Sequence, residues 1–181
     1  MIPIARLRVV WVTDFDEVPD DASLESEASH AARMGASAAW LRQPRWTTNQ
    51  RLRAVDFLRR LGWSVIVGRD ARAAAGADGM QCAFEGPFPD SPLPFGVSIH
   101  DPEEAPVAMA RGASWLVAGP VRNTVKRGNL VPGRGFDWLA RVTAASALPV
   151  VAVGGLGPDD VDAAVKAGAV GIAGISVFRR R

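Results

Sequence analysis

The sequence contains a single cysteine, Cys82, and no tyrosine among its 181 residues. One cysteine excludes a disulfide bond within the chain and a metal site built from several thiolates. The sequence also lacks any run of about 18 apolar residues, the length that predicts a membrane-spanning helix. The first ten residues carry Arg6 and Arg8 but lack the long apolar stretch of a signal peptide, so we expect a cytoplasmic protein with no membrane partner.

The net charge is small as well, because 21 Lys and Arg residues stand against 19 Asp and Glu residues and leave a formal charge of +2. An excess of this size does not indicate a nucleic-acid partner. Tryptophans could stack on bases, but the six in this chain are scattered and most lie beside apolar runs, so we expect them in the core. They are Trp11, Trp40, Trp46, Trp63, Trp115 and Trp138.

Short apolar runs rich in β-branched residues are what the sequence does have, and there are eight. They cover residues 9–12, 39–41, 65–67, 80–83, 96–99, 115–118, 150–153 and 171–176. Segments with helical spacing separate most of them, as in residues 48–61, where an apolar stripe lies opposite several arginines. This alternation predicts parallel strands joined by crossover helices.

Two short motifs mark the expected starts of further helices. Residues 101–104, Asp-Pro-Glu-Glu, supply an N-cap acid, a proline for the first helical position and a glutamate for a capping box, so a helix should begin directly after His100. Residues 157–160, Gly-Pro-Asp-Asp, predict a similar start for a helix over residues 161–167, which Gly168 would end.

Eight such units predict an α/β protein that closes into a (β/α)8 TIM barrel, a single domain over residues 1–181. An open doubly wound sheet is the alternative. A barrel of this kind usually has about 250 residues, so some helices must be short or absent. The Gly- and Pro-rich stretches 84–94 and 122–135 have no clear periodicity and are expected to be loops at the rim.

Active sites of such barrels lie at the carboxyl ends of the strands, and polar residues follow several of the predicted strands. Gly154 and Gly155 follow the seventh strand, and Ile175 and Ser176 end the eighth. Glycines and helix N-termini there predict a phosphate site, although the glycines could also serve only to turn the chain. His100 at the end of the fifth strand can both take and return a proton near neutral pH.

Other candidates converge on the same end of the barrel. Arg42 follows the second strand, Ser98 precedes His100, and a basic loop after the sixth strand carries Thr124 and Lys126, donors suited to an anionic group. His30, among Ser and Ala in the first predicted helix, is expected to be structural.

These residues resemble the thiamine phosphate synthase and TenI family. The similarity is most specific from residue 95 to residue 178, in three motifs. Gly-Val-Ser-Ile-His at 96–100 resembles the strand-five signature, Gly-Pro-Val at 119–121 the strand-six loop, and Val-Ala-Val-Gly-Gly at 151–155 with residues 175–176 the phosphate cradle. Weaker similarity covers most of the remaining chain, as at 12–14, 41–42 and 76–79.

The resemblance implies one of two activities. The synthase joins a pyrimidine pyrophosphate to a thiazole phosphate and needs Mg²⁺ bound by two acidic residues after strands three and four. This chain has Val-Gly-Arg at 67–69 and Phe-Glu-Gly-Pro at 84–87, so only Glu85 or, in a shifted register, Asp70 could replace them. Trp40 and Pro44 also replace polar residues of the synthase pattern, although Arg45 could stand in for its lysine.

The TenI branch performs a metal-free proton transfer that aromatises thiazole phosphate carboxylate, and Gly68, Arg69 and Gln81 are closer to that branch. We therefore predict a tautomerase without metal or other cofactor. The resemblance assigns His100 as the acid/base, Arg42, Arg69, Gln81, Ser98, Thr124 and Lys126 to substrate binding, and Gly154, Gly155, Ile175 and Ser176 to phosphate.

Two alternatives remain open at this point. One is a thiamine phosphate synthase with an altered Mg²⁺ site, and the other is a non-catalytic family member that binds a phosphorylated metabolite. A phosphorylated thiazole is the expected small-molecule partner in each case, and a homodimer is the assembly that the resemblance suggests.

Overall fold

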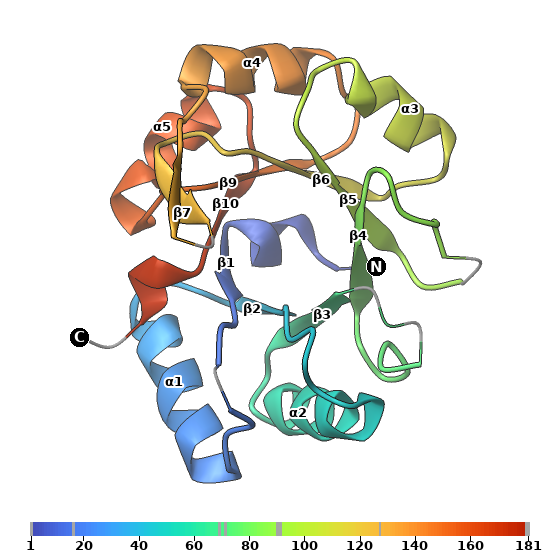
Figure 1. Ribbon diagram of the computed structural model, residues 1–181, viewed down its shortest axis with the longest axis vertical. Coiled ribbons are helices and arrows are strands. Elements are labelled where there is room, and N and C mark those ends of the chain that lie inside the picture. Colours follow the sequence, from blue (N-terminus) through green and yellow to red (C-terminus); the bar gives the residue numbers. More distant parts are fainter. Residues whose placement is uncertain are drawn as a thin grey trace.

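The computed structural model describes residues 2–15, 17–68, 70, 72–89, 92–126 and 128–179. Eight parallel strands form a closed barrel, as the sequence predicts, and the alternative of an open sheet is wrong (Figure 1). Pairing of β1 with β10, for example Val9 with Ile172, closes the ring. The strands are β1 (Val9–Val12), β2 (Ala38–Leu41), β3 (Ser64–Gly68), β4 (Gly79–Ala83), β5 (Phe95–Ile99), β6 (Trp115–Ala118), β9 (Val150–Val153) and β10 (Gly171–Gly174).

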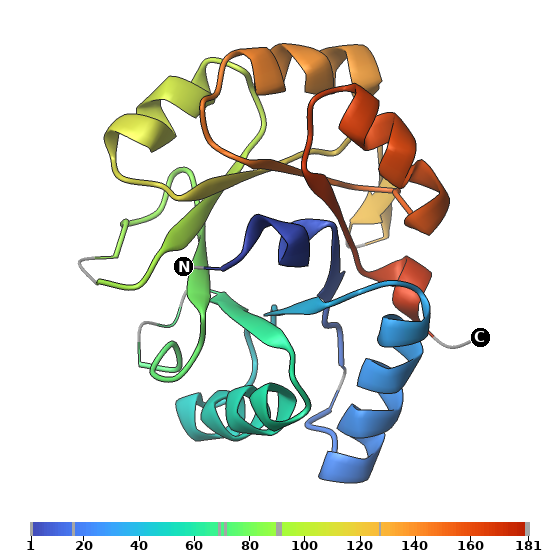
Figure 2. The same cartoon turned by 180° about the vertical axis from the view of Figure 1, so that it is seen from behind.

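The helices lie outside the ring of strands, as the opposite views in Figures 1 and 2 show. They are α1 (Asp21–Arg33), α2 (Thr48–Arg60), α3 (Glu104–Ala110), α4 (Phe136–Ala144) and α5 (Val161–Lys166), with the 3-10 helices η1 (Ile4–Leu7), η2 (Pro158–Asp160) and η3 (Ser176–Phe178). Within the described residues, no helix follows β3 or β4. The prediction that some helices are short or absent is therefore confirmed.

Helix α2 begins where the sequence predicts, because Thr47 and Gln50 form a reciprocal capping box. Helix α3, by contrast, begins at Glu104 and not directly after His100. The Asp101 carboxylate forms an ion pair with Arg134 (2.5 Å) and is not available as an N-cap acceptor. Glu104 instead accepts the backbone N–H groups of His100 (2.6 Å) and Asp101 (3.3 Å).

Two further expectations need correction. The strand predicted over residues 171–176 ends at Gly174, because Ile175 leaves the extended conformation (φ −109°, ψ −73°) and Ser176 begins η3. The stretch 122–135 was expected to be a loop but contains an antiparallel hairpin of β7 (Thr124–Lys126) and β8 (Asn129–Val131). Gly128, with φ +80°, lies in the turn between them.

The interior of the barrel holds one of three apolar clusters. Alternate strand residues such as Val12, Trp115 and Val117 point inward, and Leu7 and Ile2 join them from the amino-terminal segment. The other two clusters lie between the strands and their outer cover. Four of the tryptophans are buried, which confirms their expected place in the core; these are Trp11, Trp46, Trp115 and Trp138.

No helix in the described ranges is long and apolar enough to cross a membrane.

Candidate active site

The carboxyl ends of the eight strands form one end of the barrel, which we call the mouth. Gln81 on β4 and Ser98 on β5 face the interior below this mouth, and His100 follows Ser98 by two residues on the same face. The predicted convergence of Ser98 and His100 is thus present. Gln81, which was expected beside the ligand, is 2% exposed and lies deeper in the barrel.

His100 has a fixed hydrogen-bond partner. Its Nδ1 atom lies 2.7 Å from the carbonyl oxygen of Gly119, at the end of the neighbouring strand β6. A carbonyl can only accept, so Nδ1 must carry the proton that is donated. In the neutral ring this leaves Nε2 as an unprotonated acceptor on an exposed side chain.

Gln81 and Ser98 belong to a chain of hydrogen bonds inside the barrel. The indole Nε1–H of Trp115 donates to Oε1 of Gln81 (2.9 Å), and Nε2 of Gln81 donates to Oγ of Ser98 (3.0 Å). Trp115 was expected only in the core and had no predicted role in the site. The signal was available, because Trp115 lies four residues before Gly119 and alternation turns both positions to the same face of β6.

The glycines after β9 have a clear conformational role. Gly154 and Gly155 have φ values of +99° and +66°, which favour glycine. A Cβ atom on Gly154 would lie 2.6 Å from Cα of Pro120, and one on Gly155 would lie 2.4 Å from the carbonyl oxygen of Asn123. The segment after β6 therefore packs directly on this turn, held by a bond from Arg122 N–H to Gly154 O (2.9 Å).

The assignment of phosphate to this corner stays a prediction. Ser176 is the first residue of η3, and Ile175 at its N-cap makes no side-chain capping bond. Backbone N–H groups in the first turn of a helix have no partner within the helix. Ile175 and Ser176 thus lie at the mouth beside the Gly154–Gly155 turn, since β9 and β10 are neighbours in the barrel.

The remaining predicted binding residues are less constrained. Arg42 is exposed just after β2, and Arg69 lies outside the described residues. Thr124 is half-buried and Lys126 is exposed on β7, where alternation places both on one face of the hairpin. Next to the hairpin, an open cleft of about 470 Å³ is lined by Val121, Arg122, Asn123, Gly133, Gly135, Phe136 and Gly155.

Comparison with known proteins gives this site its context. A model of the family described as thiamine monophosphate synthase (TMP-TENI) matches residues 9–178. The chain belongs to this family.

Curated relatives of the chain carry the name thiamine-phosphate synthase. The protein from Methanoregula boonei is 38% identical over 59% of this chain and 53% of its own length. The one from Chloroflexus aurantiacus is 29% identical over 88% of this chain and 82% of its own length. In the matches to the Methanoregula protein and to one from Anaeromyxobacter dehalogenans, the chain spans about half the length of the relative.

A solved structure agrees with the family over almost the whole chain. Thiamine phosphate pyrophosphorylase from Pyrococcus furiosus superposes with a TM-score of 0.77 at 27% identity, covering 96% of this chain and 87% of its own. An N-acetylmannosamine-6-phosphate 2-epimerase from Clostridium perfringens superposes with a TM-score of 0.66 at 13% identity, which supports the fold alone.

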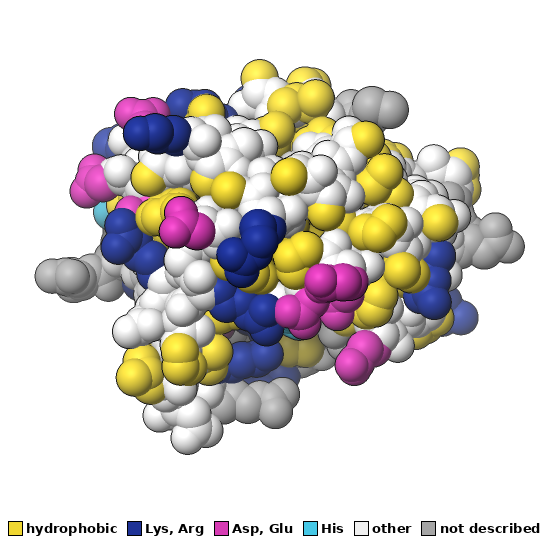
Figure 3. Space-filling view, turned by 90° about the horizontal axis from the view of Figure 1, so that it is seen from above, with side chains coloured by type: hydrophobic (Ala, Val, Ile, Leu, Met, Phe, Trp, Pro, Cys, Tyr) yellow, Lys and Arg dark blue, Asp and Glu magenta, His cyan; other side chains and the backbone are white. Residues whose placement is uncertain are grey.

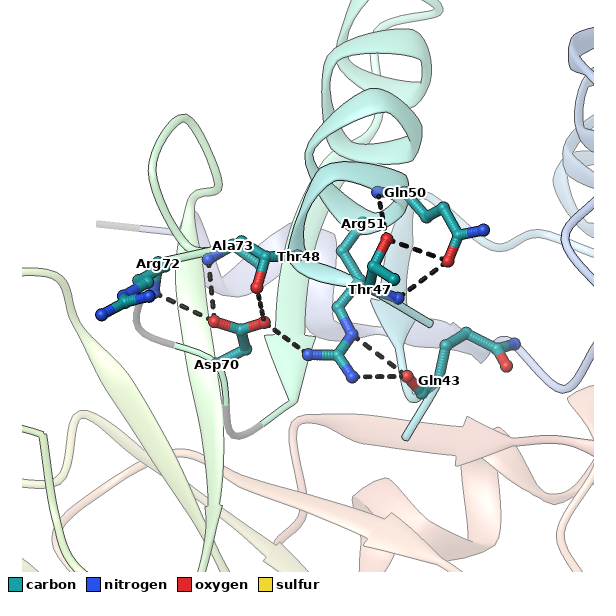
Figure 4. A network of polar contacts seen from close by, with 8 residues as sticks. All are labelled: Gln43, Thr47, Thr48, Gln50, Arg51, Asp70, Arg72 and Ala73. Atoms are coloured by element: carbon teal, nitrogen blue, oxygen red, sulfur yellow. Dashed lines mark hydrogen bonds and ion pairs between the residues drawn. The ribbon is translucent and has the colours of Figure 1, made fainter. Parts of the chain in front are cut away.

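The resemblance to the family implies Mg²⁺ ligands after the third and fourth strands, where the acids of this chain are Asp70 and Glu85. The Asp70 carboxylate is already surrounded by donors (Figure 4). Its Oδ2 accepts from the Thr48 hydroxyl (3.1 Å) and Arg51 Nη1 (2.5 Å), and its Oδ1 accepts the backbone N–H groups of Arg72 (3.1 Å) and Ala73 (3.0 Å).

This network affects the pKa of Asp70. Burial acts to raise the pKa of Asp70, but the hydrogen bonds from Ala73, Thr48 and Arg51 together hold it below its ordinary value. Arg51 also donates to the carbonyl oxygen of Gln43, at 3.0 Å from Nε and 2.8 Å from Nη2, and so ties the loop after β2 to the loop after β3. The Asp70 carboxylate is thus paired with the Arg51 guanidinium and serves the structure.

The residues at this corner do not fit a family-type Mg²⁺ site. Glu85 is exposed, and no group of three His, Cys, Asp or Glu side chains within the described part of the chain is arranged to hold a metal ion. Mg²⁺ needs oxygen ligands that are free to coordinate it. Trp40 lies on β2 next to Leu41, and its Nε1 is buried without a hydrogen bond to any described residue.

Proposed function

We propose that this chain is a tautomerase of the thiamine monophosphate synthase family that acts on thiazole phosphate carboxylate without a metal ion. The observation that carries the proposal is the contact between His100 Nδ1 and the Gly119 carbonyl, which leaves Nε2 as a base at the mouth. A proton transfer within one substrate needs one such group and a grip on the substrate. It does not need a pair of acidic metal ligands.

The proton moves in two steps. Nε2 of His100 takes a proton from a carbon of the non-aromatic substrate, and the electron pair of that bond moves into the ring system. The imidazolium formed is stabilised because its Nδ1–H still donates to the Gly119 carbonyl. Nε2 then returns the same proton to another atom of the substrate, which leaves the aromatic thiazole and the neutral base.

Binding would come from the two sides of the mouth. Backbone N–H groups around Gly154, Gly155, Ile175 and Ser176 would hold the phosphate, because amides at a helix start and in a glycine turn favour anions. The substrate carboxylate would also come within reach of cationic side chains at the mouth, such as Arg42 after β2, a strand that only β1 separates from β10. Lys126 and Thr124 of the hairpin supply further donors, and Arg69 is a candidate by its position in the sequence.

The test is turnover of thiazole phosphate carboxylate by wild-type protein and by His100→Ala. We expect His100→Ala to lower the turnover number by about two to four orders of magnitude, the usual contribution of a general acid/base. Calorimetric binding of the product should persist, because the phosphate site does not include His100. His30→Ala on α1 is the matched control and should retain full activity. Full activity of His100→Ala would refute the assignment.

A second candidate, the synthase, is favoured by the names of the relatives. The Chloroflexus protein matches over 88% of this chain and is named thiamine-phosphate synthase. Synthase activity predicts that Mg²⁺ promotes binding of the pyrimidine pyrophosphate and formation of thiamine phosphate. Such turnover, lost in Glu85→Gln, would replace the tautomerase proposal. Binding of the thiazole compounds that is indifferent to Mg²⁺, with no response to the pyrophosphate, would support the tautomerase.

A further inference from the structure

Below the mouth, three interior side chains from three strands form a directed chain of hydrogen bonds. Trp115 is 3% exposed and Gln81 is 2% exposed, so neither exchanges partners with bulk water. Nε1–H of Trp115 donates to Gln81 (2.9 Å), and Gln81 donates to Ser98 (3.0 Å). The chain begins on β6, crosses to β4 and ends on β5, two residues before His100.

The chemistry of these groups fixes the direction of every bond. An indole N–H can only donate, so it must face the carbonyl oxygen of the Gln81 amide. The NH₂ group of Gln81 is thereby turned to Ser98, whose oxygen accepts. The hydroxyl hydrogen of Ser98 must then point elsewhere, and it is donated to no residue in the described ranges. Ser98 therefore has a donor left over for a ligand.

Two glycines make room for this arrangement. A Cβ atom on Gly96 would lie 2.0 Å from Nε1 of Trp115 and 2.4 Å from Oε1 of Gln81. A Cβ atom on Gly79 would lie 2.7 Å from the far edge of the same indole. All three distances are too short for any real contact. Because Gly79 on β4 and Gly96 on β5 have no side chains, there is space inside the barrel for Trp115 to reach Gln81.

A second unpartnered donor lies at the same end of the barrel. Trp40 packs against the interior cluster near the end of β2, and its Nε1 lies 3.2 Å from where a Cβ of Gly68, the last residue of β3, would be. This buried N–H makes no hydrogen bond to a described residue. Nε1 of Trp46 and Nε1 of Trp138 are buried without a partner in the same way, so the Trp40 N–H does not by itself identify a ligand.

We infer that Trp115 is a positioning residue that, through Gln81, fixes Ser98 as a hydrogen-bond donor, so that the floor of the mouth takes an acceptor such as a carboxylate oxygen. The inference rests on the proposed function for the choice of ligand, the substrate carboxylate. It adds a specificity preference: an accepting group is favoured at this position, because Gln81 already uses one lone pair of Ser98 while the Ser98 hydroxyl hydrogen has no acceptor among the described residues.

The test compares two ligands that differ only at the group in question. Thiazole phosphate carboxylate and thiazole phosphate are titrated by calorimetry into wild type, Trp115→Phe, Ser98→Ala and the double variant. Trp115→Phe keeps an aromatic ring but frees the Gln81 amide to reverse. We expect each single variant to bind the carboxylate compound about tenfold more weakly, with the second change adding little to the first, since both remove the same interaction.

Affinity for thiazole phosphate without the carboxylate should stay unchanged in all three variants. Equal losses for both ligands, or independent losses that multiply in the double variant, would show that Trp115 acts on the site in another way and would overturn the inference. Thermal unfolding of each variant confirms that the loss does not come from unfolded protein. Gly96→Ala provides a second route, because it displaces Trp115 from Gln81 while Ser98 is kept.

A spectroscopic measurement on the ligand-free protein separates this inference from the proposed function. Nuclear magnetic resonance should show a scalar coupling across the hydrogen bond from the Trp115 indole nitrogen to the Gln81 side-chain carbonyl, together with slow exchange of that N–H. A missing coupling overturns the inference whatever the ligands do. The wild-type protein could instead show the coupling and bind neither thiazole compound. That result would overturn the proposed function, and with it the choice of the substrate carboxylate as ligand.

Discussion

Asp70 shows how a charged residue at the end of a barrel strand can serve the fold. It follows β3 at the mouth, yet the network of Thr48, Arg51 and the two backbone amides surrounds both of its oxygens. Its side chain is 14% exposed, and that of Arg51 is 12% exposed. A buried anion with this many donors is costly to leave unpaired, so the pair holds α2 against the loop after β3.

Asp70→Asn should therefore destabilise the protein in a pH-dependent way. Because the pKa of Asp70 is lowered in the folded state, its ionised form stabilises the fold at pH above the unfolded pKa of about 3.9. That stability is lost as the pH falls through the lower folded-state pKa. At pH 7 we expect a loss of about 1 to 3 kcal/mol in the free energy of unfolding, measured with urea.

The pH profile gives the contradicting outcome. Between pH 7 and a pH below 4, wild type should lose the Asp70 contribution, whereas Asp70→Asn should not. Asp56→Asn is the matched control, because Asp56 pairs with Arg60 on the exposed face of α2 and should change the stability little. Parallel pH profiles for wild type and Asp70→Asn would show that the carboxylate charge is not the stabilising feature.

For single residues, the sequence predicted which side chains lie at the mouth. It did not predict the hydrogen-bond partners that fix those side chains. His100 and Ser98 could be placed because a strand period of two and a helix start fix their side of the sheet. The partner that sets the tautomer of His100 could not, because the Gly119 carbonyl meets it only through the pairing of β5 with β6. The Gln81–Trp115 bond, 34 residues apart, has the same long-range origin.

Among the elements, the segment between β4 and β5 has no helix in its described residues, 84–89 and 92–94, and aromatic side chains cover the barrel there. Phe84 and Phe88 pack against the apolar cluster outside the strands that includes Phe95. Phe88 contacts Phe95 edge to face, with ring centroids 5.6 Å apart. The guanidinium of Arg111, just after α3, lies 5.1 Å from the centre of the Phe88 ring and 5.9 Å from that of Phe84. The Arg111 guanidinium contacts both phenyl rings and so holds the segment between β4 and β5 against the end of α3.

Arg111→Ala should therefore loosen the cover locally while leaving the barrel folded. Cys82 on β4 is 7% exposed and packs in the same cluster, so its thiol reports any opening of the segment. We expect Arg111→Ala to raise the rate of Cys82 modification by a thiol reagent by about tenfold, because Arg111 is exposed and each of its two cation–π contacts contributes about 0.5 to 1 kcal/mol.

The matched control is Arg60→Ala, which removes a similar contact over Phe57 (5.8 Å) on the distant helix α2. Its labelling rate should equal that of wild type. Equal rates for all three proteins would mean that Arg111 does not hold the segment in place.

Element boundaries followed the sequence wherever local signals acted alone. The capping box of Thr47 and Gln50 put the start of α2 at the predicted residue. The start of α3 shifted because Asp101 pairs with Arg134, 33 residues away. The hairpin of β7 and β8 went unpredicted because three-residue strands with exposed side chains give no apolar period to detect.

For the whole molecule, closure of the barrel brings the first and last strands of the chain side by side. β1 pairs with β10 in the ring, and Asp14 after β1 forms an ion pair with Arg179 after η3. The amino-terminal segment with η1 lies across the inside of the ring in both views of the molecule (Figures 1 and 2). Figure 3 shows charges of both signs interspersed with apolar side chains on one outer face, in keeping with the small net charge.

The eight apolar runs predicted this closure only in outline. Alternation of strands and helical segments indicated a barrel, and each inward-facing residue then had to meet others from the rest of the ring. The role of η1 was not predicted, because nothing within residues 4–7 shows that Leu7 packs with Val10, Val117 and Trp115 of the barrel interior. Such contacts exist only once the ring has formed.

Leu7→Ala should therefore destabilise the entire barrel, since Leu7 is 2% exposed and fills its interior. We expect a loss of about 2 to 5 kcal/mol in the free energy of unfolding by urea, the usual range for a buried leucine. Ile4→Ala in the same 3-10 helix is the control, because Ile4 is 56% exposed and should cost less than about 0.5 kcal/mol. One cooperative transition should remain in both variants, since the segment and the ring share a core. An early separate transition in Leu7→Ala would instead show that the amino-terminal segment folds onto a barrel that is already stable without it.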